Sequence, residues 1–143
     1  MDINRMKGGR GFTLLELLVV IVIIGLLAAF VAPRYFGQIG RSKTQIAKAQ
    51  IEAFEKALDQ YRIDVGQYPA TNQGLGALFV QGANDANWHG PYLKKGVPAD
   101  PWGHAYIYNA PGSDGREYEI ISYGADNKQG GDKADDVDIT SWD

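Results

Sequence analysis

MKGGRGFTLLELLVVIVIIGLLAAF, residues 6–30, places a short basic stretch directly before a long apolar run, and the architecture of the chain follows from this arrangement. From Phe12 to Val31 only Thr13, Glu16 and Gly25 are not strongly apolar. As an α-helix this run would measure ~30 Å, about the hydrocarbon thickness of a lipid bilayer. The segment is therefore able to span a membrane.

The charges around the run predict its orientation. Arg5, Lys7 and Arg10 precede it, and such basic residues stay on the cytoplasmic side of a membrane. Everything after Pro33 is then expected on the far side.

A cleaved secretory signal peptide is the common alternative for such a segment. Its cleavage site requires small side chains at the last and third-last positions before the cut. The candidate cuts after the alanines of the run put a large residue at the third-last position: Leu26, Leu27 or Phe30. A plain single-span anchor remains open, but it gives Glu16 no role.

Glu16 is the unusual residue of the run, because burying an unpaired carboxylate costs several kcal/mol. The stretch Gly11-Phe12-Thr13-Leu14-Leu15-Glu16 resembles the leader junction of type IV prepilins and type II secretion pseudopilins. The resemblance implies that a prepilin peptidase removes residues 1–11 by cutting between Gly11 and Phe12. It also implies that the new N-terminus of Phe12 is N-methylated, and that Glu16 becomes the fifth residue of the mature chain.

Cleavage would give Glu16 a partner. The new ammonium group of Phe12 lies one helical turn from this carboxylate and can pair with it, or with the same carboxylate of an adjacent subunit. A matched pair in a packed bundle costs far less than two isolated charges in lipid. We therefore expect Phe12 and Glu16 to favour assembly, with the segment serving first as a membrane span and then as a filament core.

A second periodic pattern extends the helix beyond the apolar run. Apolar residues recur at spacings of four and three on one face: Ala47, Ile51, Phe54, Leu58, Tyr61 and Val65. The patterns predict one helix from about residue 12 to about residue 65, apolar all round in 12–33 and amphipathic in 34–65. Gly25 and Pro33 are the points where the helix is expected to be weakened.

Residues 66–143 are expected to form a globular head. They begin as loop, with a short helical patch near 73–80. Two alternating stretches, 105–108 and 118–122, predict antiparallel strands joined by the turn 111–115. This hairpin, alone or within a three-stranded sheet, would cover the helical stripe. The expected fold class is α+β, with the long helix packed on a small antiparallel sheet as in type IV pilins.

Three further stretches narrow the resemblance to the major pseudopilins of type II secretion systems. They are YPATNQGL at 68–75, followed by Ala77 and Leu78, then DPWG at 100–103 and SYGADNKQGGDKADDVDITSWD at 122–143. The resemblance implies a subunit that polymerises into the periplasmic pseudopilus and drives folded proteins across the outer membrane.

The partners implied by the resemblance are other copies of the chain, minor pseudopilins, an inner-membrane assembly platform with a cytoplasmic ATPase, and the prepilin peptidase, which is also the methyltransferase. Before assembly the subunit would be a single-pass protein of the bacterial inner membrane, with its head in the periplasm. The alternative within the same fold is the major subunit of a surface type IV pilus. Type IVa pilins usually carry a C-terminal cysteine pair, and this chain has no cysteine.

A third alternative is a membrane-anchored enzyme or binding module, but the sequence offers no catalytic constellation. His89 and His104 stand alone in loop-like sequence, without a nucleophile nearby. Trp88, Trp102 and Trp142 are interpreted as anchors of loops on the core. The formal net charge of −3, without a basic surface, indicates that nucleic acid is not a partner.

The acidic tail is a candidate metal site. Five aspartates lie in a glycine-containing loop: Asp126, Asp132, Asp135, Asp136 and Asp138. Calcium prefers such oxygen ligands, although the spacing is not that of an EF-hand and a solvated acidic tail remains open. The pseudopilin resemblance implies one structural calcium ion, with side-chain ligands from Asp126, Asp136 and Asp138 and carbonyl ligands from Tyr123 and Val137. The choice among the later four aspartates stays open.

Overall fold

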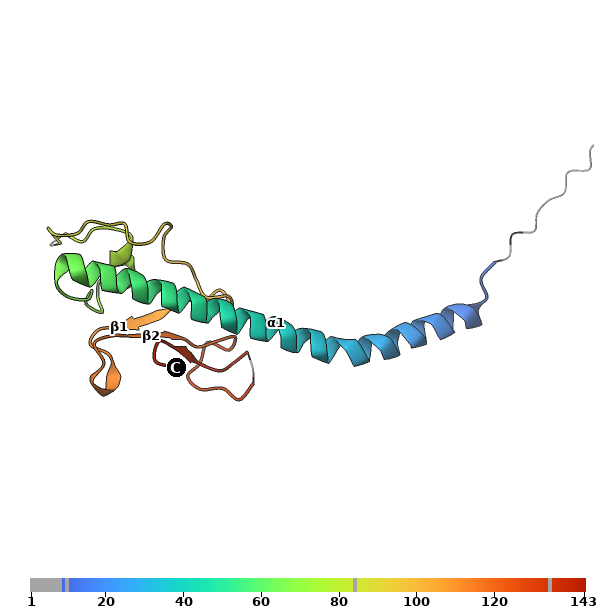
Figure 1. The fold of residues 1–143 in the computed structure, drawn as a ribbon. Helices are drawn as coiled ribbons and strands as arrows, with labels where there is room; N and C mark the ends of the chain where they lie inside the picture. The colour runs from blue at the N-terminus through green and yellow to red at the C-terminus, as the bar shows by residue number, and fades with distance from the viewer. Residues whose placement is uncertain (1–8, 10, 84, 134) are drawn as a thin grey trace, which may run out of the picture. The chain divides into compact units, whose positions relative to one another are not determined.

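The structure is a computed structural model that describes residues 9, 11–83, 85–133 and 135–143. Its elements follow in this order: helix α1 (Leu14–Val65), the short 3-10 helix η1 (Leu75–Leu78), strand β1 (Ile107–Asn109), the 3-10 turn η2 (Ser113–Gly115), strand β2 (Glu119–Ser122) and strand β3 (Ile139–Thr140). Figure 1 shows these elements along the chain. The backbone forms two compact units, residues 1–37 and 38–143.

The first unit contains the apolar part of α1. The helix continues through Gly25 and Pro33, so the expected weak points do not interrupt it. Among the described residues α1 is the helix long and apolar enough to cross a membrane. No part of its most apolar stretch is buried against the rest of the chain. This surface needs lipid or another protein to cover it.

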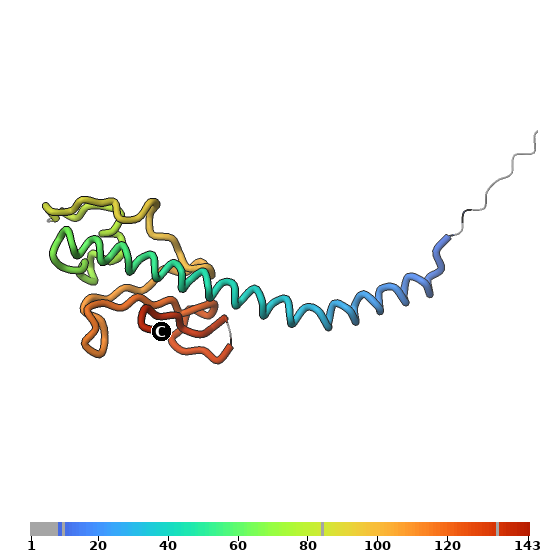
Figure 2. The backbone as a smooth tube through the Cα atoms, in the orientation of Figure 1, coloured from blue at the N-terminus to red at the C-terminus, as the bar shows by residue number. Residues whose placement is uncertain are grey.

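The second unit contains the core, built on the amphipathic part of α1. The predicted stripe is buried from Ala47 to Tyr61, and Ala57, which the stripe did not include, is buried as well. Val65 is only partly buried. Leu78 of η1, Tyr108 of β1 and Ile120 of β2 pack in the same core. In Figure 2 the segments before and after β1 pass on opposite sides of this part of α1. Each fully buried large apolar side chain contributes about 1.5–3 kcal/mol.

The sheet has the order β1-β2-β3, and both of its pairs are antiparallel. In the predicted hairpin Ile107 lies opposite Ile121 and Asn109 opposite Glu119. Strand β1 begins two residues later than the predicted strand 105–108. The third strand comes from the acidic tail, where Ile139 lies opposite Ser122.

Asp100 organises the loop between η1 and β1 from a buried position, with 4% of its surface exposed. The hydroxyl of Ser122 donates to its Oδ2 at 2.6 Å. The backbone N–H groups of Trp102 and His104 donate to its Oδ1 at 3.1 and 2.8 Å. The turn closes at Gly103, whose φ of 90° suits glycine. Asp100 therefore ties this loop to the end of β2.

Replacing Asp100 by alanine is expected to lower the free energy of unfolding by about 3 kcal/mol, because it leaves three donors without their buried acceptor. Urea unfolding of residues 38–143 measures the change. Asp100→Asn is the matched control, since it keeps an acceptor and should lose less. Equal urea midpoints for the parent and Asp100→Ala would show that the network does not stabilise the fold.

Glu119 is a second buried acid, at the start of β2. The backbone N–H of Ser113 donates to its Oε2 at 3.0 Å, the Ser113 hydroxyl donates to the same oxygen, and Asn109 Nδ2 donates to Oε1 at 2.8 Å. The hydrogen bonds from Ser113, followed by the one from Asn109, lower the pKa of this carboxyl below its usual 4.5.

A lowered pKa in the folded state stabilises the protein above the unfolded pKa, and this stabilisation is lost as the pH falls through the folded pKa. We therefore expect the unfolding free energy to decrease below about pH 4.5. Glu119→Gln should be less stable at neutral pH and should lose less on acidification. Urea unfolding across this range tests the expectation, with the exposed Glu117→Gln as control. Parallel pH curves for the parent and Glu119→Gln would contradict it.

Candidate assembly and metal sites

The chain enters α1 through three exposed, non-helical residues, Gly11, Phe12 and Thr13. Phe12 is 84% exposed. Residues 1–8 and 10 of the predicted leader lie outside the described residues. The Gly11–Phe12 peptide bond therefore lies in irregular backbone just before the helix, which is the kind of segment that proteases cut.

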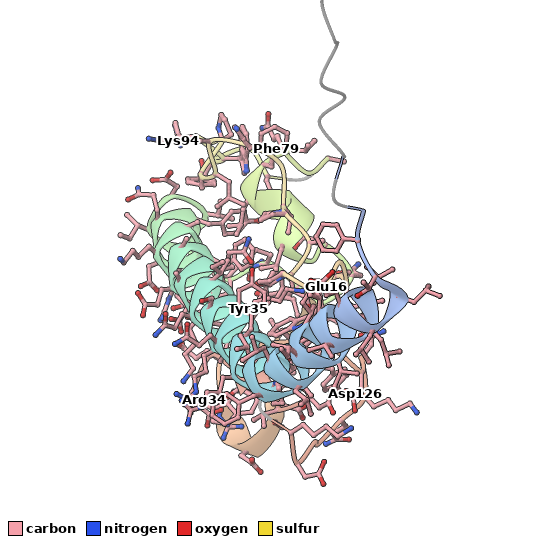
Figure 3. The ribbon with its side chains drawn as sticks, turned by 90° about the vertical axis from the view of Figure 1, so that its right-hand side faces the viewer. Glu16, Arg34, Tyr35, Phe79, Lys94 and Asp126 are labelled. Atoms are coloured by element: carbon pink, nitrogen blue, oxygen red, sulfur yellow. The ribbon has the colours of Figure 1, made fainter. Side chains whose placement is uncertain are left out.

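Glu16 makes a reciprocal cap at the first turn of α1. Its Oε2 accepts hydrogen bonds from the backbone N–H and the hydroxyl of Thr13, at 3.1 and 3.3 Å, and the Thr13 hydroxyl oxygen accepts from the Glu16 N–H at 3.1 Å. Such a capping box satisfies backbone donors that the helix itself leaves free. Figure 3 shows Glu16 near this end of α1.

Thr13 is not among the residues predicted for assembly, although its signal is readable. Threonine followed three residues later by glutamate, directly before an apolar run, is a helix-start pattern. The cap turns the Glu16 carboxylate back toward the chain end at which cleavage would create a charge. No described residue donates to its second oxygen, Oε1, which leaves that oxygen available to a new donor.

The two ends of the acidic tail lie against each other. The Ala125 N–H donates to the Asp135 carbonyl at 2.7 Å. Gly124 has a φ of 66°, and a Cβ at this position would lie 2.5 Å from the Asp135 carbonyl oxygen and 3.2 Å from the Val137 carbonyl oxygen. Only glycine fits this approach without strain. The residues after β2 and those before β3 therefore form a close backbone cradle.

The predicted side-chain ligands are not gathered into one cluster. Asp126 is exposed and its Oδ1 accepts from the Lys128 N–H at 3.0 Å. Asp138 Oδ2 accepts from the Gly130 N–H at 2.9 Å. The described histidines and acids contain no group of three able to hold a metal ion. The structure thus brings the backbone of Val137 to Gly124, but it does not bring Asp126, Asp136 and Asp138 together.

One oxygen of this loop fits a cation. Asp138 Oδ1 is buried and has no hydrogen-bond partner within the described part of the chain. A buried carboxylate oxygen without a donor is costly, and a bound cation would remove that cost. The donor set, carboxylates and backbone carbonyls, is the oxygen chemistry that calcium takes.

The remaining candidate residues have structural positions. His89 is exposed, and His104 Nδ1 lies 3.1 Å from the Gly124 carbonyl oxygen. Trp88 and Trp102 pack against the core, as expected for loop anchors. Trp142 is 41% exposed and lies under the Arg116 guanidinium, with 4.2 Å between Cζ and the ring centroid.

Two family profiles match the chain in succession. The profile described as "Prokaryotic N-terminal methylation motif" matches residues 6–32, and the one described as "Type II secretion system (T2SS), protein G" matches residues 34–142. Together they cover both the leader junction and the head.

Similar proteins are named "Type II secretion system core protein G". The one from Pseudomonas aeruginosa is 45% identical over 137 residues, covering 93% of this chain and 94% of that protein. The one from Vibrio cholerae is 42% identical over 142 residues, covering 97% and 95%. The crystal structure of the major pseudopilin from the type 2 secretion system of enterohaemorrhagic Escherichia coli is similar with a TM-score of 0.59 at 33% identity, covering 75% of this chain and 92% of that one.

Proposed function

The chain belongs to the protein G family of type II secretion systems, and we propose that it is made as a precursor cut between Gly11 and Phe12. Members of this family are major pseudopilins. The chain is therefore a structural subunit that forms the pseudopilus for secretion, and not an enzyme.

The observation that carries the processing proposal is the methylation motif over residues 6–32, directly before the protein G match. The exposed Gly11–Phe12 bond supports it. A prepilin peptidase would make the cut and methylate Phe12. The subunit would wait in the inner membrane with its head in the periplasm, and then join other copies, minor pseudopilins and the assembly platform. The protein G match favours this filament over a surface type IV pilus.

The Glu16 carboxylate would then act in assembly by pairing with the Phe12 ammonium group. The capping box supports this role, because it holds the carboxylate next to the residue that follows Phe12. Lipid covers the exposed apolar part of α1 before assembly, and neighbouring helices cover it afterwards.

A calcium ion would tie the acidic tail to the head. Its side-chain ligands would be Asp126, Asp136 and Asp138, and its carbonyl ligands Tyr123 and Val137. The unpartnered Asp138 Oδ1 and the close approach at Gly124 support the site. The chain has no cysteine, so this ion would stabilise a tail that no disulfide holds.

The mature N-terminus tests the processing. Mass spectrometry of the protein from its own bacterium should give a chain that begins at Phe12 and carries one added methyl group. A mature chain that begins at any other residue would contradict the proposed cut. A deletion strain should lose secretion of folded proteins and regain it when the gene is restored; loss of motility with intact secretion would instead favour a surface pilus.

A further inference from the structure

Arg34, Tyr35 and Phe36 follow directly on the apolar run of α1, and the processing, pairing and calcium proposals leave them without a role. Arg34 is the first charged residue after Glu16 in the sequence. Tyr35 and Phe36 are 64% and 67% exposed. A tyrosine and a phenylalanine so far exposed, beside a lone cation, need something to contact.

These three residues point to three different sides of the helix. Consecutive helical residues point about 100° apart, so three in a row project in three directions. Among the described residues their ring contacts lie within α1: the Arg34 Cζ lies 5.5 Å from the Phe30 ring centroid, and the Tyr35 and Phe36 rings meet edge to face at 6.3 Å between centroids. A protein that packs on one face of a helix contacts a stripe of residues spaced three and four apart. A girdle such as Arg34-Tyr35-Phe36 fits surroundings that touch the helix from every side.

The headgroup layer of a bilayer provides such surroundings. Tyrosine is enriched there because its ring is apolar and its hydroxyl is polar. Arginine keeps its aliphatic stem in apolar contact while its guanidinium hydrogen-bonds to phosphate. In this girdle the Arg34 side chain extends back over the last turn of the apolar run, with its guanidinium over the Phe30 ring, so its aliphatic stem already has apolar contact at that boundary.

The position of the girdle along α1 also matches the bilayer. At 1.5 Å per residue, Arg34 lies ~30 Å along the helix from Thr13, about one hydrocarbon thickness. With the girdle at one headgroup layer, Thr13 reaches the other, and Glu16 lies within ~5 Å of it. A carboxylate at that depth reaches the interface with its side chain, which lowers the cost of holding it in the membrane.

We propose that the girdle Arg34-Tyr35-Phe36 binds the phosphate headgroups of the periplasmic leaflet and sets the depth of the span, which keeps Glu16 within one turn of the cytoplasmic surface. The proposal rests on the membrane-spanning part of the proposed function and not on assembly. It gives the subunit a fixed height in the membrane before any other copy binds it.

The lack of cysteine makes the depth measurable, because single cysteines can carry a spin label. The uncut full chain is placed in vesicles of phosphatidylethanolamine and phosphatidylglycerol at high lipid excess, with the label at Ala29→Cys or Gln38→Cys. Electron paramagnetic resonance then compares the access of oxygen and of a water-soluble nickel complex to each label. In the parent, we expect the label at 29 in hydrocarbon and the label at 38 in water.

Replacing all three girdle residues by leucine lengthens the apolar segment and keeps it helical. We expect the label at 38 to move toward the hydrocarbon by about one helical turn, ~5 Å. The control Arg34→Lys, Tyr35→Trp, Phe36→Trp keeps the interfacial chemistry and should keep the parent depth. The proposal is wrong if the leucine variant leaves the label at 38 at the parent depth or moves it outward, or if the control shifts as the leucine variant does. A parent label at 29 in water would instead overturn the membrane-spanning function itself.

Discussion

Glu16→Ala is expected to abolish filament assembly while cleavage at Gly11 and membrane insertion remain largely intact. The variant leaves the Phe12 ammonium group without its partner at a site that assembly desolvates. Breaking such a buried pair costs about 3–5 kcal/mol, and even 3 kcal/mol corresponds to roughly a hundredfold loss of affinity for each added subunit. Electron microscopy of sheared filaments, with immunoblots of the membrane fraction, separates assembly from insertion.

Two further variants separate the charge of Glu16 from its role in the capping box. Glu16→Gln keeps a side-chain acceptor at the third helical position but removes the charge, so it should fail to assemble, as alanine does. Thr13→Ala removes the cap and keeps the charge; it should weaken the helix start by about 1 kcal/mol and still assemble. Normal filaments from Glu16→Gln would overturn the pairing argument and leave the cap as the reason for this residue.

Helix α1 could be predicted because the residues that specify it are close together in the sequence. The apolar run and the stripe from Ala47 to Tyr61 repeat with the period of an α-helix, and the structure buries that stripe. The cap at Thr13 is equally local, since four consecutive residues contain the whole pattern.

The third strand could not be predicted in this way. Ile139 and Thr140 follow a run of aspartates, a residue type depleted in strands, and they become a strand because β2 offers an edge to pair with. The same is true of the buried acids. Asp100 and Glu119 look like surface residues in the sequence, and only the folded chain brings Ser122 and Ser113 to them as donors.

The arrangement of the tail aspartates around a metal ion could not be predicted from the sequence. Their number and spacing predict an oxygen-rich loop, but the structure holds Asp126 in a local turn and, among the described residues, leaves one oxygen of Asp138 without a partner. Carboxylates repel one another, so a cation is needed to gather them. We therefore expect the side-chain arrangement of this site to depend on the ion.

Calcium is accordingly expected to raise the melting temperature of residues 38–143, the unit that contains the whole buried core. At a hundredfold excess over its dissociation constant, an ion that binds only the folded state adds about 2.7 kcal/mol. For a domain of this size, that corresponds to a rise of roughly 10 °C or more. A chelator should reverse the rise. Magnesium should produce a smaller one, because it demands stricter octahedral geometry.

Substitutions of the tail aspartates identify the ligands, because the loss of a ligand should reduce the rise in melting temperature that calcium produces. Asp126→Ala combined with Asp136→Ala should melt at one temperature with or without calcium, and Asp138→Asn should weaken the response by removing one charge from the buried position. Asp132→Ala is the matched control: it removes an exposed acid from the same tail, outside the proposed ligand set, and should respond as the parent does. A parent indifferent to calcium, or a double variant that still responds fully, would make the tail a solvated acidic surface that is tied to the sheet through β3.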